Sequence, residues 1–310
     1  MANAKVTQLL NETAMTVINL MESEGVNWSK PWVNTTRKNG QPISIYKREY
    51  SGINRWILGM KMSLNDWQSP VFATFKKWKE VGAKIKKNEK ATNVFLYKNF
   101  VKKVENDQGE EEEILLRKSD TFPVFNADQV EGWDGNWLKP EKEIELSKDW
   151  SDIELADLIV NNTGATIHYK DQDHAFYSPS SDVIVMPTKE QFKDQNGYYG
   201  TMFHELIHWT GSDSRLARTF GKRFGDKKYA CEELVAELGA AMLSGIARVD
   251  ATPRADHAKY LNTWIKGLKD SPSLLMKAAS KAEEASQYII EQSSNNNDKV
   301  RQLVMDLVAA

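Results

Sequence analysis

One short motif constrains this chain more than any other feature: residues 204–208 read His-Glu-Leu-Ile-His, inside a mostly apolar stretch. Residues four apart share one face of an α-helix, so a helix here presents the imidazoles of His204 and His208 side by side. Neutral imidazole nitrogens bind a divalent metal at about 2.0–2.1 Å. Glu205 flanks that metal, where the general base for a metal-bound water must lie. Because the chain has only five histidines in 310 residues, the spacing favours a metal site over two unrelated helix residues.

A catalytic metal site of this kind needs a third protein ligand, and a second predicted helix provides candidates. Residues 229–246 place apolar side chains at helical spacing, and three glycines before them let this helix fold back against the first. We expect Glu233 to be the third ligand, with Glu232 and Glu237 as competitors. Glu237, one turn further on, is expected to accept a hydrogen bond from the free ring nitrogen of a ligand histidine. Glu232 is expected to face solvent.

The ligand set also bears on which metal binds. Two histidines and a glutamate predict zinc (Zn2+), although the same donors accept manganese (Mn2+) or another divalent metal. Cys231 is the single cysteine, so no internal disulfide can form. Its commoner role beside such a helix is that of a small buried residue. As a fourth ligand it would close the metal site and make the metal structural.

These motifs resemble those of a known family. Residues 204–211, Arg215–Arg218 and Glu233–Glu237 are similar to the zincin-type metallopeptidase domain of ArdC antirestriction proteins. Residues 177–187 resemble the strand that precedes the metal helix in that family, and the resemblance continues through the amino-terminal half. It implies a zincin fold, a peptidase centre, and a role in protecting the DNA of a mobile element, plasmid or phage, from host restriction.

The charge of the chain is divided unevenly. Residues 1–104 hold 18 Lys and Arg against 7 Asp and Glu, whereas the remainder holds 23 against 36. A basic half joined to an acidic half indicates that the first binds a polyanion. Five of the ten tryptophans also fall before residue 80. Exposed bases stack on aromatic rings at ~1–3 kcal/mol each while cations follow the phosphates, so this mixture favours single-stranded nucleic acid. The sequence contains no zinc-finger, basic-leucine or clear helix-turn-helix pattern, so sequence-specific binding to duplex DNA is disfavoured.

Ten residues are the candidates for nucleic-acid binding. Those expected to stack on bases are Trp28, Trp32, Tyr50, Trp56 and Trp78, and those expected to contact phosphates are Lys76, Lys77, Lys84, Lys86 and Lys87. For any single aromatic residue, a place in the core is as good an interpretation, because large rings are usually buried.

Five short motifs in this half, taken in order, resemble the amino-terminal, single-stranded-DNA-binding domain of the ArdC family: residues 28–32, 50–54, 75–76, 82–87 and 125–129. Asn88 stands where that pattern leads us to expect a turn glycine. The acidic run 110–113 would repel DNA if it faced the binding groove.

The predicted fold class is α+β, with two domains. Residues 1–130 are predicted to bind single-stranded DNA, 131–150 to form a linker, and 151–310 to form a zincin-like metallopeptidase domain. Within the first domain we expect a helix over 4–23 and a β-hairpin beginning at residue 92. No apolar run reaches the length of a membrane span, and we expect no secretory signal because the amino-terminal residues include no continuous apolar segment and no cleavage site, so a cytoplasmic location is expected.

The sequence therefore predicts a partner, single-stranded DNA, and a catalytic-type metal site with Glu205 as base, and the resemblance to the ArdC family implies that its reaction is hydrolysis of a peptide bond. The protein substrate is not identified by any motif. One other class is a DNA-binding protein whose metal is structural and which cleaves no peptide. A metal-dependent nuclease is disfavoured, because such sites use clustered Asp and Glu around a hard cation.

Overall fold

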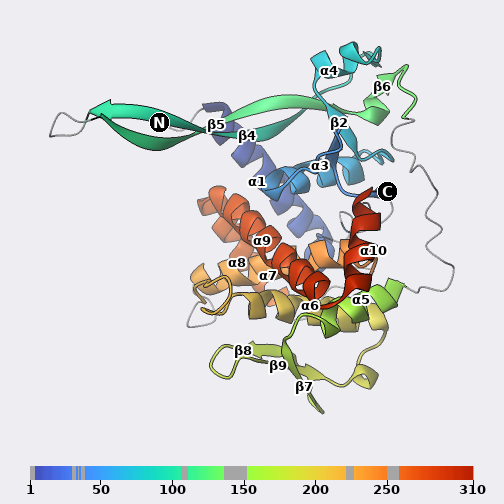
Figure 1. Ribbon diagram of the computed structural model, residues 1–310, viewed down its shortest axis with the longest axis vertical. Helices are drawn as coiled ribbons and strands as arrows, with labels where there is room; N and C mark the ends of the chain where they lie inside the picture. Colours follow the sequence, from blue (N-terminus) through green and yellow to red (C-terminus); the bar gives the residue numbers. More distant parts are fainter. Residues whose placement is uncertain are drawn as a thin grey trace.

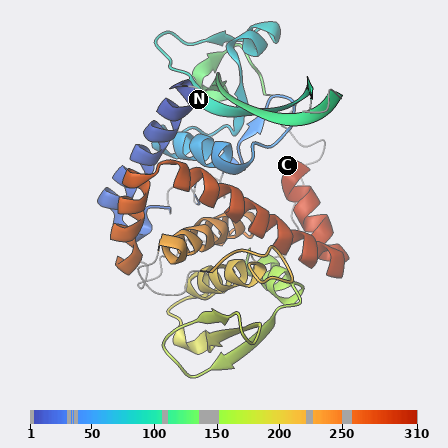
Figure 2. The same ribbon diagram turned by 90° about the vertical axis from the view of Figure 1, so that its left-hand side faces the viewer.

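The structure, a computed structural model, describes residues 4–29, 33, 35, 39–105, 111–135, 152–220, 227–249 and 258–309. Its elements form three tiers along the long axis (Figures 1 and 2): sheets and shorter helices of the N-terminal half, then long packed helices, then a small sheet. The mixed α+β class predicted from the sequence is confirmed. None of the helices in these ranges is long and apolar enough to cross a membrane.

The N-terminal half contains a four-stranded sheet. Its elements are α1 (Ala4–Glu24), the 3-10 turn η1 (Gly25–Asn27), β1 (Ile43–Ser44), α3 (Gly52–Leu64), β2 (Val71–Ala73), α4 (Phe75–Glu80), β3 (Lys84–Ile85), β4 (Thr92–Glu105), β5 (Glu111–Asn126), η2 (Ala127–Gln129) and β6 (Val130–Glu131). The strand order is β1-β2-β5-β4, with β1 parallel to β2 and the other pairs antiparallel, while β3 and β6 form a separate antiparallel pair. The expected hairpin is confirmed as β4 and β5, which Figure 1 shows projecting from the rest of the molecule.

The second half contains the long helices and a three-stranded sheet. Its elements are α5 (Asp152–Asn161), β7 (Thr166–Lys170), β8 (Phe176–Ser178), β9 (Val183–Pro187), the 3-10 turn η4 (Lys189–Gln191), α6 (Gln195–Thr210), α7 (Lys227–Ile246), α8 (Ala258–Asp270), α9 (Ser273–Asn296) and α10 (Asp298–Ala309). β9 is the central strand, parallel to β7 and antiparallel to β8. α6 and α7, the two helices that the metal motif predicts, pack against each other and against α9.

One hydrophobic cluster spans both halves of the chain. It joins Val17, Trp28 and Trp56 from the first half to Leu206 and Leu234 from the second, and all five side chains are buried. α1 runs down beside α8 and α9, as the two views show (Figure 2), and α3 packs on α9. Burial of apolar surface is the main stabilising contribution to folding, so this shared core ties the stability of one half to that of the other.

A buried polar contact reinforces this junction at the start of α3. Glu283 on α9 accepts a hydrogen bond from the backbone N–H of Gly52, and its carboxylate lies 3.2 Å from Arg55. A carboxylate is favourable at the N-terminus of a helix, where backbone N–H groups have no partner within the helix. α3 therefore begins at a cap that the other half of the chain supplies.

Candidate metal centre and nucleic-acid surface

α6 carries the two histidines of the motif into the core. Asp194 caps this helix by accepting a hydrogen bond from the N–H of Gly197 at 2.8 Å. His204 and His208, one turn apart, are 2% and 9% exposed, and their Nε2 atoms lie 3.1 Å from each other. Both rings thus direct the same nitrogen towards one point.

α7 brings Glu233 to that point. The two carboxylate oxygens of Glu233 lie 3.5 Å from Nε2 of His204 and 3.6 Å from Nε2 of His208. Ligands held at ~2.1 Å around a tetrahedral ion stand about 3.4 Å from one another, so the three residues fit a zinc-sized divalent cation. They form the one cluster of His, Cys, Asp or Glu with metal-ligand spacing in the described part of the chain, and Cys231 is not a member of it.

The close approach of α7 to α6 depends on a glycine. A Cβ added to Gly239 would lie 2.6 Å from Cδ1 and 2.8 Å from Cγ1 of Ile207, which is fully buried on α6. Carbon atoms in contact normally stand about 3.5–4.0 Å apart. The close spacing of α6 and α7 that positions Glu233 therefore depends on the absence of a side chain at residue 239.

The structure corrects the prediction for Glu232. This side chain is 5% exposed rather than solvated, and its Oε1 lies 3.3 Å from Nδ1 of His208. Arg218, also buried, donates to both oxygens of Glu232 at 2.8–3.2 Å and to the carbonyl of Ile207. Glu232 thus contacts a ring nitrogen of His208, the kind of contact that was expected of Glu237. The carboxylate of Glu237 accepts a hydrogen bond from Ser29 at 3.3 Å, and its expected contact with a ligand histidine stays a prediction.

These contacts shift the pKa values of both partners. Burial acts to lower the pKa of His208, but the hydrogen bond with Glu232 and the charges of Glu233 and Glu205 outweigh it and raise that pKa. Burial acts to raise the pKa of Glu232, but hydrogen bonds with His208 and Arg218 outweigh it and hold that pKa below its usual value. The centre therefore concentrates negative charge and attracts a cation, as a metal site requires.

Glu205 and one unpredicted residue lie beside this cluster. Glu205 is 3% exposed, and its charge contributes to raising the pKa values of His208 and Tyr229. Tyr229 stands on the first turn of α7, with its hydroxyl hydrogen-bonded to Glu233 and 3.2 Å from that of Tyr260. The signal that indicates Tyr229 is its position four residues before Glu233, which puts both on one face of α7.

A further network holds the strand side of the centre. Arg215 donates to Asp182 and to the hydroxyl of Tyr177, and its guanidinium stacks 4.1 Å from the centre of the Trp209 ring. β9, the central strand of the adjacent three-stranded sheet, is paired on both edges, so main-chain pairing of a peptide with this sheet is possible only at β7 or β8.

Three of the candidate base-stacking residues are core residues instead. Trp28 and Trp56 are each 2% exposed and stack on each other with ring centres 6.2 Å apart. Trp78 is fully buried and donates from its indole nitrogen to the carbonyl of Phe125 at 3.0 Å. A buried ring presents no face to a base, so the base-stacking prediction is corrected for these three tryptophans.

The remaining candidates divide by exposure. Tyr50 is half-buried with its ring edge-on to Phe72, and burial raises its pKa to about 12. Trp32 and the side chains of the acidic run 110–113 lie outside the described residues. Among the lysines, Lys77 is half-buried and the exposed ones are Lys76, Lys84, Lys86 and Lys87. Lys86 also donates to the carbonyl of Asp128 at 2.7 Å, so it has a structural contact of its own.

Several family-like motifs of the N-terminal half have structural roles. The side-chain amide of Asn54 donates to the carbonyl of Phe95 and accepts from its N–H, both at 2.8 Å, so it fixes α3 to β4. Asn126 and Gln129 form a capping box around η2. Asn88 adopts φ of +68°, the left-handed conformation expected of glycine at that turn.

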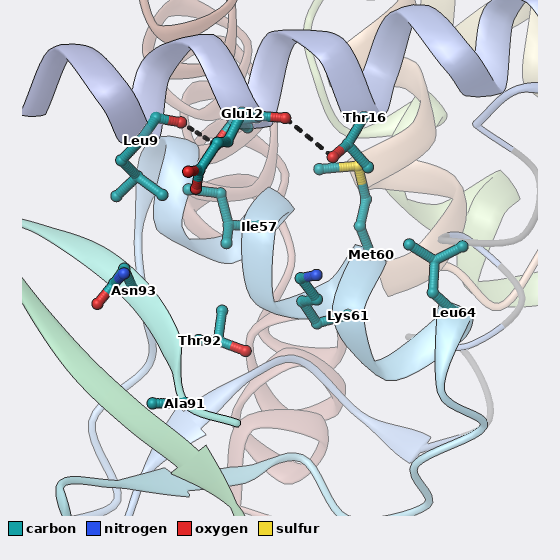
Figure 3. Close-up of a pocket in the computed structure, with 11 residues that line it drawn as sticks. Leu9, Glu12, Thr16, Ile57, Met60, Lys61, Leu64, Ala91, Thr92 and Asn93 are labelled. Carbon is teal, nitrogen blue, oxygen red and sulfur yellow. Dashed lines mark hydrogen bonds between the residues drawn. The ribbon is translucent and has the colours of Figure 1, made fainter. Parts of the chain in front are cut away.

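A separate hollow of about 140 Å³ opens between α1, α3 and the start of β4 (Figure 3). Leu9, Ile57 and Met60 give it an apolar wall, and Glu12 and Lys61 add one charge of each sign. The metal-centre residues do not line it. This hollow lies in the N-terminal half of the chain, apart from the metal centre.

Comparisons with known proteins agree with this geometry. Residues 7–130 match the N-terminal domain of anti-restriction factor ArdC, and residues 154–281 match a zincin-like metallopeptidase. The metal-free crystal structure of the antirestriction ArdC protein from plasmid R388 is 33% identical, with a TM-score of 0.71 over 93% of this chain and 98% of that chain. The chain belongs to the ArdC family of antirestriction proteins. The Mn(II)-bound structure of the R388 ArdC protein is 30% identical, with a TM-score of 0.73 over 93% and 99% of the two chains.

Similar curated proteins include longer ones. Two proteins named DNA primase TraC from Escherichia coli are 31% and 34% identical over 90% and 85% of this chain. The ArdC-family chain spans only 27% and 18% of their lengths. The uncharacterized protein y4eC of Sinorhizobium fredii is 25% identical over 95% of this chain and 96% of its own. The predicted linker 131–150 falls between the two family matches, largely outside the described residues, and its boundaries stay a prediction.

Proposed function

We propose that this ArdC-family protein is an antirestriction factor that binds single-stranded DNA of a mobile element and carries a metal-dependent peptidase centre. The observation that carries the proposal is the convergence of His204, His208 and Glu233, within 3.1–3.6 Å of one another, in a chain that also matches the ArdC N-terminal domain. Zinc is the proposed cofactor, and the Mn(II)-bound relative supports manganese as an alternative.

The chemistry assigned to the centre rests on its residues. When bound, a divalent cation supplies Lewis-acid chemistry, polarising a carbonyl and lowering the pKa of a coordinated water. Glu205 accepts the proton of the attacking water and returns it to the leaving amine. Glu232, held by Arg218, fixes the ring of His208 so that Nε2 faces the cluster.

The DNA-binding part of the proposal rests on the family match and on exposed cations. Lys76, Lys84 and Lys87 project from α4, β3 and the turn after it, and the first 104 residues carry a large excess of positive charge. Coating a single strand denies a duplex-specific restriction enzyme its substrate without breaking any bond. We therefore assign protection to the DNA-binding half, with peptide hydrolysis as a separate activity.

A DNA-transfer assay into a restricting host tests this assignment. The variants are Glu205→Gln, which keeps the shape of the centre, and a combined replacement of Lys76, Lys77, Lys84 and Lys87 by Gln. Lys86 is left in place because of its contact with Asp128. We expect Glu205→Gln to protect the incoming DNA and the lysine variant to fail. Protection by the lysine variant together with failure of Glu205→Gln would assign the function to proteolysis of a host factor.

The second class, a DNA-binding protein with a structural metal, predicts a closed coordination sphere. Cys231, the residue that would close it, is absent from the ligand cluster found among the described residues. X-ray absorption spectroscopy of the metal-loaded protein decides between the two. A sulfur ligand would favour the structural role, and an exchangeable oxygen ligand the catalytic one.

A further inference from the structure

Two aromatic rings of the N-terminal half stand out by their exposure. Tyr46 is 63% exposed and Phe75 is 59% exposed, in a half whose described tryptophans at 28, 56 and 78 are buried. Burial of a large apolar ring is favourable, so two rings left exposed beside basic residues require an explanation.

The fold holds both rings at the same edge of the sheet. β1 and β2 are parallel, with Ser44 opposite Phe72, so both strands end on the same side. Tyr46 lies two residues after the end of β1, and the N–H of Ile45 between them donates to the carbonyl of Phe72 at 3.0 Å. Phe75 follows β2 and begins α4, which the hydroxyl of Thr74 caps by accepting from the N–H of Lys77 at 3.3 Å. Residues on such ordered elements bind with little loss of backbone entropy.

Cations surround the two rings. The Nζ of Lys77 lies 4.8 Å from the centre of the Tyr46 ring, which ties α4 to the turn that carries this tyrosine. The side chain of Lys76, beside Phe75, is 88% exposed, and Lys47 and Arg48 next to Tyr46 are exposed as well. Glu80 lies within ion-pair distance of two of the three lysines of α4, 4.0 Å from Lys76 and 3.4 Å from Lys77.

We propose that Tyr46 and Phe75 form a base-stacking platform for single-stranded DNA, with Lys76, Lys47 and Arg48 contacting the flanking phosphates. This inference rests on the proposed function and names the surface that performs it. Rings that accept bases and cations that follow the backbone are the two components of sequence-tolerant single-strand binding. The same surface fits a protein partner poorly, because the centres of protein interfaces are depleted in lysine.

Binding of a fluorescent oligothymidine to the full-length protein tests the platform. Tyr46→Ala and Phe75→Ala are each expected to weaken binding by about fivefold or more, and the double variant by more than either. The salt dependence of binding should stay unchanged in these variants, because no phosphate contact is removed. In Lys76→Gln the slope of log affinity against log salt should fall, by about 0.7 for one lost phosphate contact.

Matched controls separate this idea from the proposed function and from misfolding. Phe176→Ala removes an exposed ring of β8, in the other half, and Lys61→Gln removes an exposed lysine of α3; both should bind as wild type. Aromatic exchange, Tyr46→Phe with Phe75→Tyr, should preserve affinity. Wild-type affinity in the double alanine variant would overturn the platform while single-strand binding stands. Failure of the wild type itself to bind would overturn the proposed function.

Discussion

Replacing Glu232 with glutamine tests how the metal centre is supported. The change keeps the size of the side chain and an acceptor oxygen, but it removes the negative charge that lies 3.3 Å from the ring of His208. It also leaves the buried guanidinium of Arg218, 2.8 Å from the same carboxylate, without that charge partner. A histidine ring less firmly held and less polarised is a weaker metal ligand.

The expected magnitude follows from the geometry. Across the imidazole, the Glu232 carboxylate stands roughly 6–7 Å from the cation position. Two unit charges at that separation interact at about 2–3 kcal/mol when the effective dielectric constant is ~20. Because the charge of Arg218 cancels part of this, we expect the metal dissociation constant to rise about 10- to 100-fold, the range usual for such supporting residues.

Competition with a chromophoric chelator measures that change for Zn2+ and for Mn2+. The matched control is Glu237→Gln, since Glu237 is also buried on α7 and was the residue assigned to this role from the sequence. The melting temperature of each metal-free variant shows whether folded protein has been lost. If Glu237→Gln weakens metal binding and Glu232→Gln leaves it unchanged, the arrangement around His208 described above is not the one that binds metal.

Three further outcomes are expected. Glu205→Gln should retain stoichiometric metal by elemental analysis and lose hydrolysis of a peptide library; loss of the metal would make Glu205 a ligand. Gly239→Ala should lower the free energy of unfolding, measured by urea titration, by about 1–3 kcal/mol, because the added methyl group overpacks the contact between α6 and α7. Gly267→Ala is the control, since its added Cβ meets only the end of the Leu274 side chain at 3.1 Å, and it should cause no such loss. Equal effects of the two variants would contradict the close helix contact. Glu283→Ala should lower the free energy of unfolding by about 3 kcal/mol, at the lower end of the range for breaking a buried ion pair, because Arg55 keeps its contact with Glu49 at 2.7 Å. An unchanged urea midpoint would show that the Glu283 contact does not hold the two halves together.

The metal ligands could be predicted because their arrangement is local. The spacing of His204 and His208 fixes their common face once a helix forms, and the apolar pattern around them predicts that helix. Glu233 required one further assumption, that α7 folds back on α6. The expectation that Glu232 faces solvent was wrong, because its burial depends on Arg218, which lies in the loop between the two helices. The supporting role expected of Glu237 stays a prediction.

The residues that bind nucleic acid were harder to predict, because composition does not show which side chains are buried. Trp56 and Trp78 have the same chemistry whether buried or exposed, and only the tertiary packing places them in the core. No helix was predicted over residues 52–64, where α3 lies, and the acceptor at its N-terminus is Glu283, 231 positions later. Contacts between residues so far apart in the sequence cannot be recognised from its hydrophobic periodicity.

The core shared by the two halves has an evolutionary consequence. A module can be exchanged between proteins when its boundary crosses few buried contacts. Here the buried cluster and the Glu283 cap cross the junction, so recombination between the halves would expose apolar surface on both. The two halves should therefore be inherited as one block. The TraC proteins fit this expectation, because a region covering 85–90% of this chain is found within each much longer protein.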